Sequence, residues 1–186
     1  VRAIAYQNSN DLNPSTDTRT VTVSVSDGDG GTSNLATLQV NVTDVNDAPL
    51  VYGSGHYQIY QQRGSELTLF DSVTIDPVEA GQTITELQLN IWNYWNDGNM
   101  NDALTIDGSV IPLTAGSGTT AISGLSWTIS GGSSISILTL SKAQGLSGAA
   151  ASALVSAITY SNTGSDAQYG FRQFELSSVK DSGGTA

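Results

Sequence analysis

Along much of this chain, apolar residues alternate with polar ones. That period of two is typical of β-strands that bury one face. The clearest cases are residues 19–26, where Thr and Val alternate, and residues 35–42. A longer run at 83–92 places most of its Ile and Leu residues on one face. Shorter segments of the same kind predict further strands at 1–6, 67–70, 73–75, 103–106, 110–113, 125–129 and 135–140.

Glycine, aspartate and asparagine separate these segments and predict turns. Asp107-Gly108 favours a two-residue hairpin turn, and residues 27–31 read Asp-Gly-Asp-Gly-Gly. Residues 146–157 differ, because they are rich in Ala and Leu and poor in β-branched residues, so they predict one short helix. Short antiparallel strands joined by tight turns predict an all-β fold of the β-sandwich type.

An internal repeat relates the two ends of the chain. Residues 1–8 (VRAIAYQN) recur as residues 155–162 (VSAITYSN), with five of eight positions identical at an offset of 154 residues. Arg19 then matches Arg172 at an offset of 153, and Asp27 matches Asp181 at 154. The extra residue falls at Ser177-Ser178, where we expect a β-bulge.

The repeat predicts two domains of unequal completeness. Residues 1–49 are expected to be the C-terminal part of one repeat, and residues 50–186 the next repeat without its last strand, the counterpart of residues 35–42. A sandwich that lacks a strand exposes the edge of its neighbour. Either residues 35–42 fold back to fill that gap, or another chain supplies the strand, which would build linear polymers.

The chain is strongly acidic. Its 186 residues include 17 acidic and 6 basic side chains, for a formal net charge of −11. This balance argues against nucleic acid as a partner, because phosphate binding needs clustered Lys and Arg. No apolar run reaches the length of a membrane span, so we expect no membrane insertion. The absence of cysteine is ordinary for a secreted domain of this size, whose core does not need disulfides.

A short acidic connector follows the strand predicted at 35–42. Asp44 and Asp47 offer carboxylates, Asn46 offers an amide or backbone carbonyl oxygen, and Pro49 stiffens the exit by fixing its own φ. Hard oxygen donors packed this closely suit Ca²⁺, which takes about six to eight oxygens. The alternative is that these acids only cap turns and keep the protein soluble.

The connector resembles the Asp-x-Asn-Asp-x-Pro linker of cadherins and of cadherin-like repeats in large bacterial surface adhesins of the RTX and VCBS types. The resemblance implies a cadherin- or immunoglobulin-like sandwich with Ca²⁺ bound where consecutive repeats join. By this resemblance, the linker ligands would be Asp44, Asn46 and Asp47. Asp76 or Glu79 would stand in for the Asp-x-Asp loop of the next repeat. Asp181 would be the late aspartate, and Asp27 its equivalent at the upstream junction. Because Asp76-Pro77-Val78-Glu79 replaces an intact Asp-x-Asp, we expect one ion rather than three.

An aromatic cluster offers different chemistry. Trp92, Tyr94 and Trp95 could stack on the apolar face of a sugar while neighbouring amides bind its hydroxyls. The plainer alternative places Trp92 and Tyr94 on one strand face in the core and Trp95 at a turn; Trp127 is expected in the core. Residues 97–102 resemble part of an EF-type calcium loop, but Gly108 stands where its bidentate Glu belongs. A local cation site at 97–102 stays an alternative.

Nothing in the sequence points to catalysis. The single histidine, His56, follows Gly-Ser-Gly in an expected loop, and no nucleophile elbow is present. Arg19 and Arg172 are expected to form salt bridges with loop acids such as Asp17 and Asp166.

We therefore expect a protein that is not an enzyme. It would be a structural or adhesive repeat unit of an extracellular or cell-surface bacterial protein, stiffened by Ca²⁺, with neighbouring repeats or other copies of itself as partners in filaments or biofilm. The alternative is a carbohydrate-binding module that binds surface glycans.

Overall fold

The computed structural model of the chain describes residues 3–55, 65–93, 101–131, 134–162, 164 and 172–184. Within that part the chain is all-β, with antiparallel strands and one short helix, as the alternation of apolar and polar residues predicts. It divides into two compact units, Val1–Asn46 and Asp47–Ala186. We refer to them as the N-terminal unit and the C-terminal unit.

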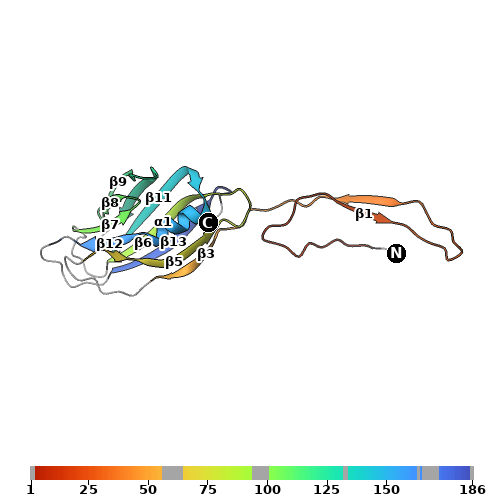
Figure 1. Cartoon of the computed structure of the whole chain (residues 1–186), viewed down its shortest axis with the longest axis horizontal. Coiled ribbons are helices and arrows are strands. Elements are labelled where there is room, and N and C mark those ends of the chain that lie inside the picture. The colour runs from red at the N-terminus through yellow and green to blue at the C-terminus, as the bar shows by residue number, and fades with distance from the viewer. Residues whose placement is uncertain are drawn as a thin grey trace. The chain divides into compact units, whose positions relative to one another are not determined.

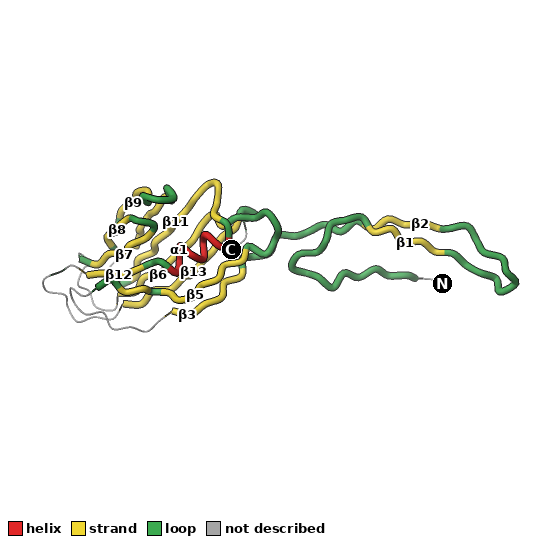
Figure 2. Tube along the Cα trace, in the orientation of Figure 1, coloured by secondary structure: helices red, strands yellow, loops and turns green. Residues whose placement is uncertain are grey.

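The N-terminal unit is built on one hairpin (Figure 2). β1 (Arg19–Val23) pairs antiparallel with β2 (Ala36–Val40), and Val21 lies opposite Leu38. Most of its apolar side chains are exposed, including Leu38, which is 64% exposed. The strand predicted at residues 1–6 is wrong for its described part, because residues 3–18 form no strand.

The C-terminal unit contains two larger antiparallel sheets (Figure 1). The five-stranded sheet has the order β13 (Arg172–Asp181), β6 (Ile84–Asn93), β11 (Ile135–Leu146), β10 (Ser126–Gly131), β9 (Gly116–Thr119). The four-stranded sheet has the order β4 (Leu67–Thr68), β12 (Thr159–Asn162), β7 (Asp102–Ile106), β8 (Ser109–Pro112).

The apolar faces of these sheets share one core, which makes the unit a β-sandwich. Leu87, Leu89 and Ile91 alternate along β6 and are buried, as the pattern at 83–92 predicts. They belong to one cluster with buried residues of the other sheet, such as Leu104. Trp127 packs against this core, as expected, and lies so close to β9 that a Cβ added to Gly118 would come within 2.8 Å of the indole. β9 itself was not predicted, because its Gly-Ser-Gly-Thr sequence resembles a turn.

A third, two-stranded sheet pairs β3 (Leu50–Gly55) with β5 (Phe70–Asp76). The helix α1 (Gly148–Ser156) packs along β5 and confirms the short helix predicted at 146–157 (Figure 1). Ser147 caps its first turn, since the Ser147 hydroxyl accepts the backbone N–H of Ala150.

Two serines of α1 cap backbone groups of β5. The N–H of Ile75 donates to the Ser152 hydroxyl at 2.8 Å, and the N–H of Val73 donates to the Ser156 hydroxyl at 3.1 Å. The two serines are four residues apart on one helix face, so their spacing matches that of alternate strand residues. The helix therefore covers an edge whose N–H groups would otherwise lack partners.

Two further local predictions are confirmed. Asp107 and Gly108, with φ of 49° and 75°, form the two-residue turn between β7 and β8. The pairing of β13 with β6 shifts register between Leu176 and Ser178, which is the bulge that the repeat predicts.

Candidate functional site

The acidic linker leads into a contact with the loop that follows β5. The backbone N–H of Asp47 donates to Oε1 of Glu79 at 2.6 Å, and the two residues belong to the same compact unit. Glu79 is only 7% exposed, and its second oxygen, Oε2, is buried and accepts no hydrogen bond within the described part of the chain. A buried carboxylate oxygen without a donor is unfavourable, so Oε2 of Glu79 is a candidate ligand atom for a cation.

The loop that carries Glu79 has a defined but strained backbone. Oδ1 of Asp76 accepts the N–H of Val78 at 2.9 Å, and the N–H of Glu79 donates to the carbonyl of Pro77 at 2.8 Å. Val78 has a φ of 70°, which is unfavourable for a β-branched residue by about 1–3 kcal/mol. The exposed Asp76 thus caps the turn, and the strained turn directs Glu79 inward.

Asp181 and Asp27, which the repeat aligns, also cap turns. Asp181 is buried, whereas Asp27 is exposed. Each carboxylate accepts two backbone N–H groups of the glycine-rich turn that follows it, at 2.9 to 3.1 Å. Asp181 accepts the N–H groups of Gly183 and Gly184. Asp27 accepts the N–H groups of Asp29 and Gly31. The shared role supports the repeat alignment. Oδ1 of each carboxylate therefore caps a turn, and calcium binding by Asp181 and Asp27 stays a prediction.

The remaining predicted ligands, Asp44 and Asn46, belong to the N-terminal unit and are half-buried. Oδ1 of Asp44 accepts the N–H of Val45 at 3.2 Å. Across the described ranges, no group of three or more His, Cys, Asp or Glu side chains is arranged to hold a metal ion. Among the described residues, a hydrogen bond joins the predicted ligands Asp47 and Glu79, and calcium binding stays a prediction.

A buried polar cluster that sequence reasoning missed joins the two main sheets. Asp102, only 1% exposed, accepts hydrogen bonds from the Tyr160 hydroxyl at 2.6 Å, from Nε of Arg172 at 2.8 Å, and from Nδ2 of Asn162. Burial and donation to the Asp102 carboxylate raise the pKa of Tyr160. The cluster fixes β7, β12 and β13 to one another.

This cluster corrects the expected roles of the two aligned arginines. Arg172 pairs in the core with Asp102 rather than with a loop acid, and Asp166 lies outside the described residues. Arg19 donates to the backbone carbonyls of Ser15 and Asp17 rather than to a carboxylate. The internal repeat could have indicated this buried cluster, because Tyr160, Asn162 and Arg172 are among its matched positions.

Trp92 lies half-buried on β6, on the face opposite the core residue Ile91. Its register partners are Ile135 on β11 and Gln173 on β13. The alternative that placed Trp92 in the core is therefore wrong. Tyr94 and Trp95 lie outside the described residues, as do His56 and residues 97–100, so the sugar-binding platform stays a prediction.

No helix in the part of the chain that the structure describes is long and apolar enough to cross a membrane. Comparison with protein-family models, with curated proteins and with solved structures found no match to this chain. Functional inference therefore rests on its own residues.

Proposed function

We propose that this chain is a structural or adhesive repeat unit of an extracellular bacterial protein, and that Ca²⁺ stiffens the junction between consecutive repeats. The observation that carries the proposal is the buried Oε2 of Glu79, whose other oxygen accepts the backbone N–H of linker residue Asp47. The internal repeat and the acidic linker support the same assignment.

The donor set suits one hard cation. Asp47 and Glu79 each supply a carboxylate, and the Asp47 backbone N–H donates to Oε1 of Glu79. Carboxylates that converge on one point repel each other unless a cation neutralises them. Asn46 and Asp44 precede Asp47 directly in the chain and add oxygen donors of the kind that Ca²⁺ prefers. Backbone carbonyls and water would complete the coordination. Asp76, Asp181 and Asp27 would then serve mainly as turn caps.

Calcium would act by fixing the path of the linker. With Ca²⁺ bound, residues 44–49 lose freedom and successive repeats keep a constant angle, whereas without it the charged linker is loose. Such a unit transmits force or spans distance between a cell surface and its neighbours. Its partners would be adjacent repeats or other copies, which could assemble into fibres through strand complementation.

Calorimetric titration of Ca²⁺ into the chelator-treated chain tests this proposal. We expect binding by the wild type, at least tenfold weaker binding by Glu79→Gln, and no change for Glu175→Gln, which removes an exposed carboxylate on β13. The bound ion should also raise the unfolding free energy, by about 2.7 kcal/mol at a hundredfold excess over Kd. Absence of binding heat together with an unchanged melting temperature would refute the calcium joint.

Carbohydrate binding is a second candidate, favoured by the half-buried position of Trp92 beside Gln173 rather than in the core. An indole on the face opposite the core can stack on a pyranose while a neighbouring amide binds the sugar hydroxyls. Titration with surface glycans should then quench tryptophan fluorescence, and Trp92→Ala should abolish that quenching. Quenching that persists in Trp92→Ala would exclude this residue.

A further inference from the structure

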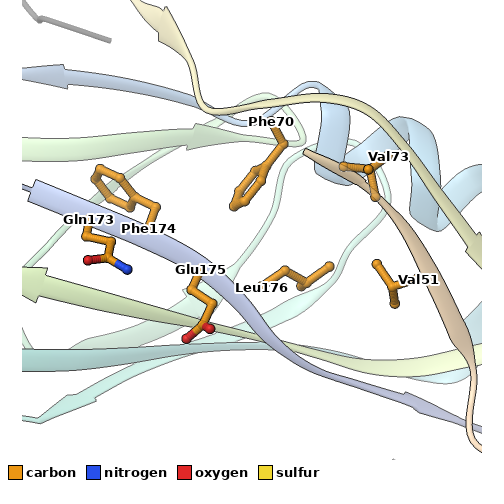
Figure 3. A pocket seen from close by; sticks show the side chains of 8 residues that line it. Val51, Phe70, Val73, Gln173, Phe174, Glu175 and Leu176 are labelled. Atoms are coloured by element: carbon orange, nitrogen blue, oxygen red, sulfur yellow. The ribbon is translucent and has the colours of Figure 1, made fainter. Parts of the chain in front are cut away.

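The five-stranded sheet of the C-terminal unit ends at β13. β6 pairs with one edge of β13, and no described strand pairs with the other edge. A groove of about 270 Å³ borders that edge (Figure 3). It is lined by residues of β3, β5 and β13, which are Val51, Gly53, Phe70, Val73 and residues 173–176.

The side chains of β13 divide between the two faces of the strand. Phe174 and Leu176 project towards the side on which Phe70, Val73 and Val51 lie, whereas Glu175 projects away from them (Figure 3). Phe174 and Leu176 are half-buried and pack against the core, while Glu175 is exposed. An incoming strand whose apolar residues alternate in the same phase would fill this groove.

The repeat supplies the register of such a strand. β1 aligns with the first half of β13 at an offset of 153 residues, and β1 pairs with β2. Transferring this pairing to β13 places Leu38 opposite Phe174, Ala36 opposite Leu176 and Thr37 opposite Glu175. Ala36 and Leu38 then face the groove, and Thr37 and Gln39 face solvent.

β2 buries little apolar surface in its own unit, so it can leave β1 at a low cost in buried area. It pairs only with β1 among the described strands, in a compact unit separate from the one that contains β13. Leu38 is 64% exposed there, so leaving β1 forfeits little buried apolar surface. Residues 35–42 are the counterpart of the strand that the C-terminal unit lacks, so β2 of a second copy has the sequence pattern that this edge requires.

We propose that the open edge of β13 receives residues 36–40 of a second copy of this chain, antiparallel and with Leu38 beside Phe174. The inference rests on the proposed repeat-unit function and names its partner. Donor strand and acceptor edge lie in different units of each molecule, so the contact is heterologous. Repeated head to tail, it generates an open filament, or a ring if the rotation closes.

Sedimentation velocity of the whole chain, from micromolar to millimolar concentration, tests the contact. We expect concentration-dependent oligomers for the wild type and at least tenfold weaker self-association for Leu38→Lys, which places a charge in the groove. Leu35→Lys is the matched control, because Leu35 is 68% exposed and lies outside β2, so it should behave as wild type. A wild type that stays monomeric throughout, or equal losses in both variants, would overturn the proposal.

Cross-linking tests the register. The chain has no cysteine, so a Thr37→Cys protein mixed with a Glu175→Cys protein can join only through the engineered thiols. Directly opposed strand residues are close enough for a disulfide, whereas diagonal pairs are farther apart. We therefore expect faster cross-linking than in a mixture of Gln39→Cys and Glu175→Cys. Equal rates would refute the register.

A single chain that carries both Thr37→Cys and Glu175→Cys identifies the occupant. Exclusive formation of an intramolecular disulfide would show that residues 36–40 fold back within one chain and would refute the exchange between copies. All measurements are repeated in Ca²⁺ and in chelator. Self-association that depends on Leu38 but not on Ca²⁺ would stand even if Asp47 and Glu79 bind no ion, so the two proposals fail separately.

Discussion

Replacing Asp102 with alanine should destabilise the C-terminal unit severely. The substitution removes the acceptor that Tyr160, Asn162 and Arg172 share. The side chain of Asp102 is fully buried and that of Arg172 is only 9% exposed. The guanidinium therefore loses its carboxylate partner where water cannot replace it.

The expected magnitude follows from this burial. Removing one partner of a buried ion pair costs about 3–5 kcal/mol, out of a total stability of roughly 5–15 kcal/mol for a folded domain. For a domain of this size, each kcal/mol lowers Tm by roughly 2–4 °C, so we expect a decrease of about 6–20 °C. Tyr160→Phe keeps the ring and removes one hydrogen bond to a charged acceptor, and should cost about 1.5–3 kcal/mol.

Urea unfolding followed by tryptophan fluorescence measures these losses. All three tryptophans lie between residues 47 and 186, so the signal reports on the C-terminal unit alone. Glu86→Ala is the control, because it breaks the ion pair with Lys180, which is 3.8 Å long and has side chains 29% and 40% exposed. Such surface pairs contribute about 0–1 kcal/mol.

The reasoning is refuted if Asp102→Ala loses no more stability than Glu86→Ala. A double variant gives a second check. Asp102→Ala combined with Arg172→Met removes the buried positive charge as well, so its loss should be smaller than the sum of the two single losses.

Three further predictions concern the same unit. Gly118→Ala should cost about 1–3 kcal/mol in unfolding free energy and shift the emission of Trp127, because the new Cβ would come within 2.8 Å of the indole; an unchanged spectrum would contradict this. Ser152→Ala should cost about 1–3 kcal/mol, since the N–H of Ile75 loses its acceptor, and faster exchange of that amide should be visible by NMR. The pKa of Tyr160 is raised because folding favours the neutral phenol. Its contribution to the free energy of unfolding is therefore complete below about pH 10 and is lost as pH rises further. Between about pH 8 and 11, urea midpoints should fall less steeply for Tyr160→Phe than for the wild type.

Features encoded by short-range pattern were predictable from the sequence. Alternation located most strands, and the Ala-rich segment located α1. The internal repeat in the sequence located the bulge near Ser177. It also aligned Asp27 with Asp181, and both carboxylates accept backbone N–H groups of the turn that follows them. Strand β9 was missed because glycine and serine carry no alternation, and it exists only because β10 provides its hydrogen-bond partner.

The two copies of the repeat show that the local sequence pattern does not by itself decide whether a segment forms a strand. Residues 3–6 form no strand, whereas their counterparts at 157–160 lead into β12, which pairs with β4 and β7. Ile4 is 66% exposed, while its counterpart Ile158 is fully buried. The difference lies in the partners available, because a strand needs hydrogen bonds and a packed face that residues distant in sequence supply.

The candidate site follows the same division. The sequence by itself determined that acids gather at 44–47 and around residue 79, and that one face of most strands is apolar. Only the tertiary structure decided that Glu79 is buried against the Asp47 amide, that Asp76 stays exposed, and that Asp102 accepts Arg172 in the core. The physical reason is that side-chain periodicity is a property of consecutive residues, whereas burial and the choice of ionic partner depend on which strands meet.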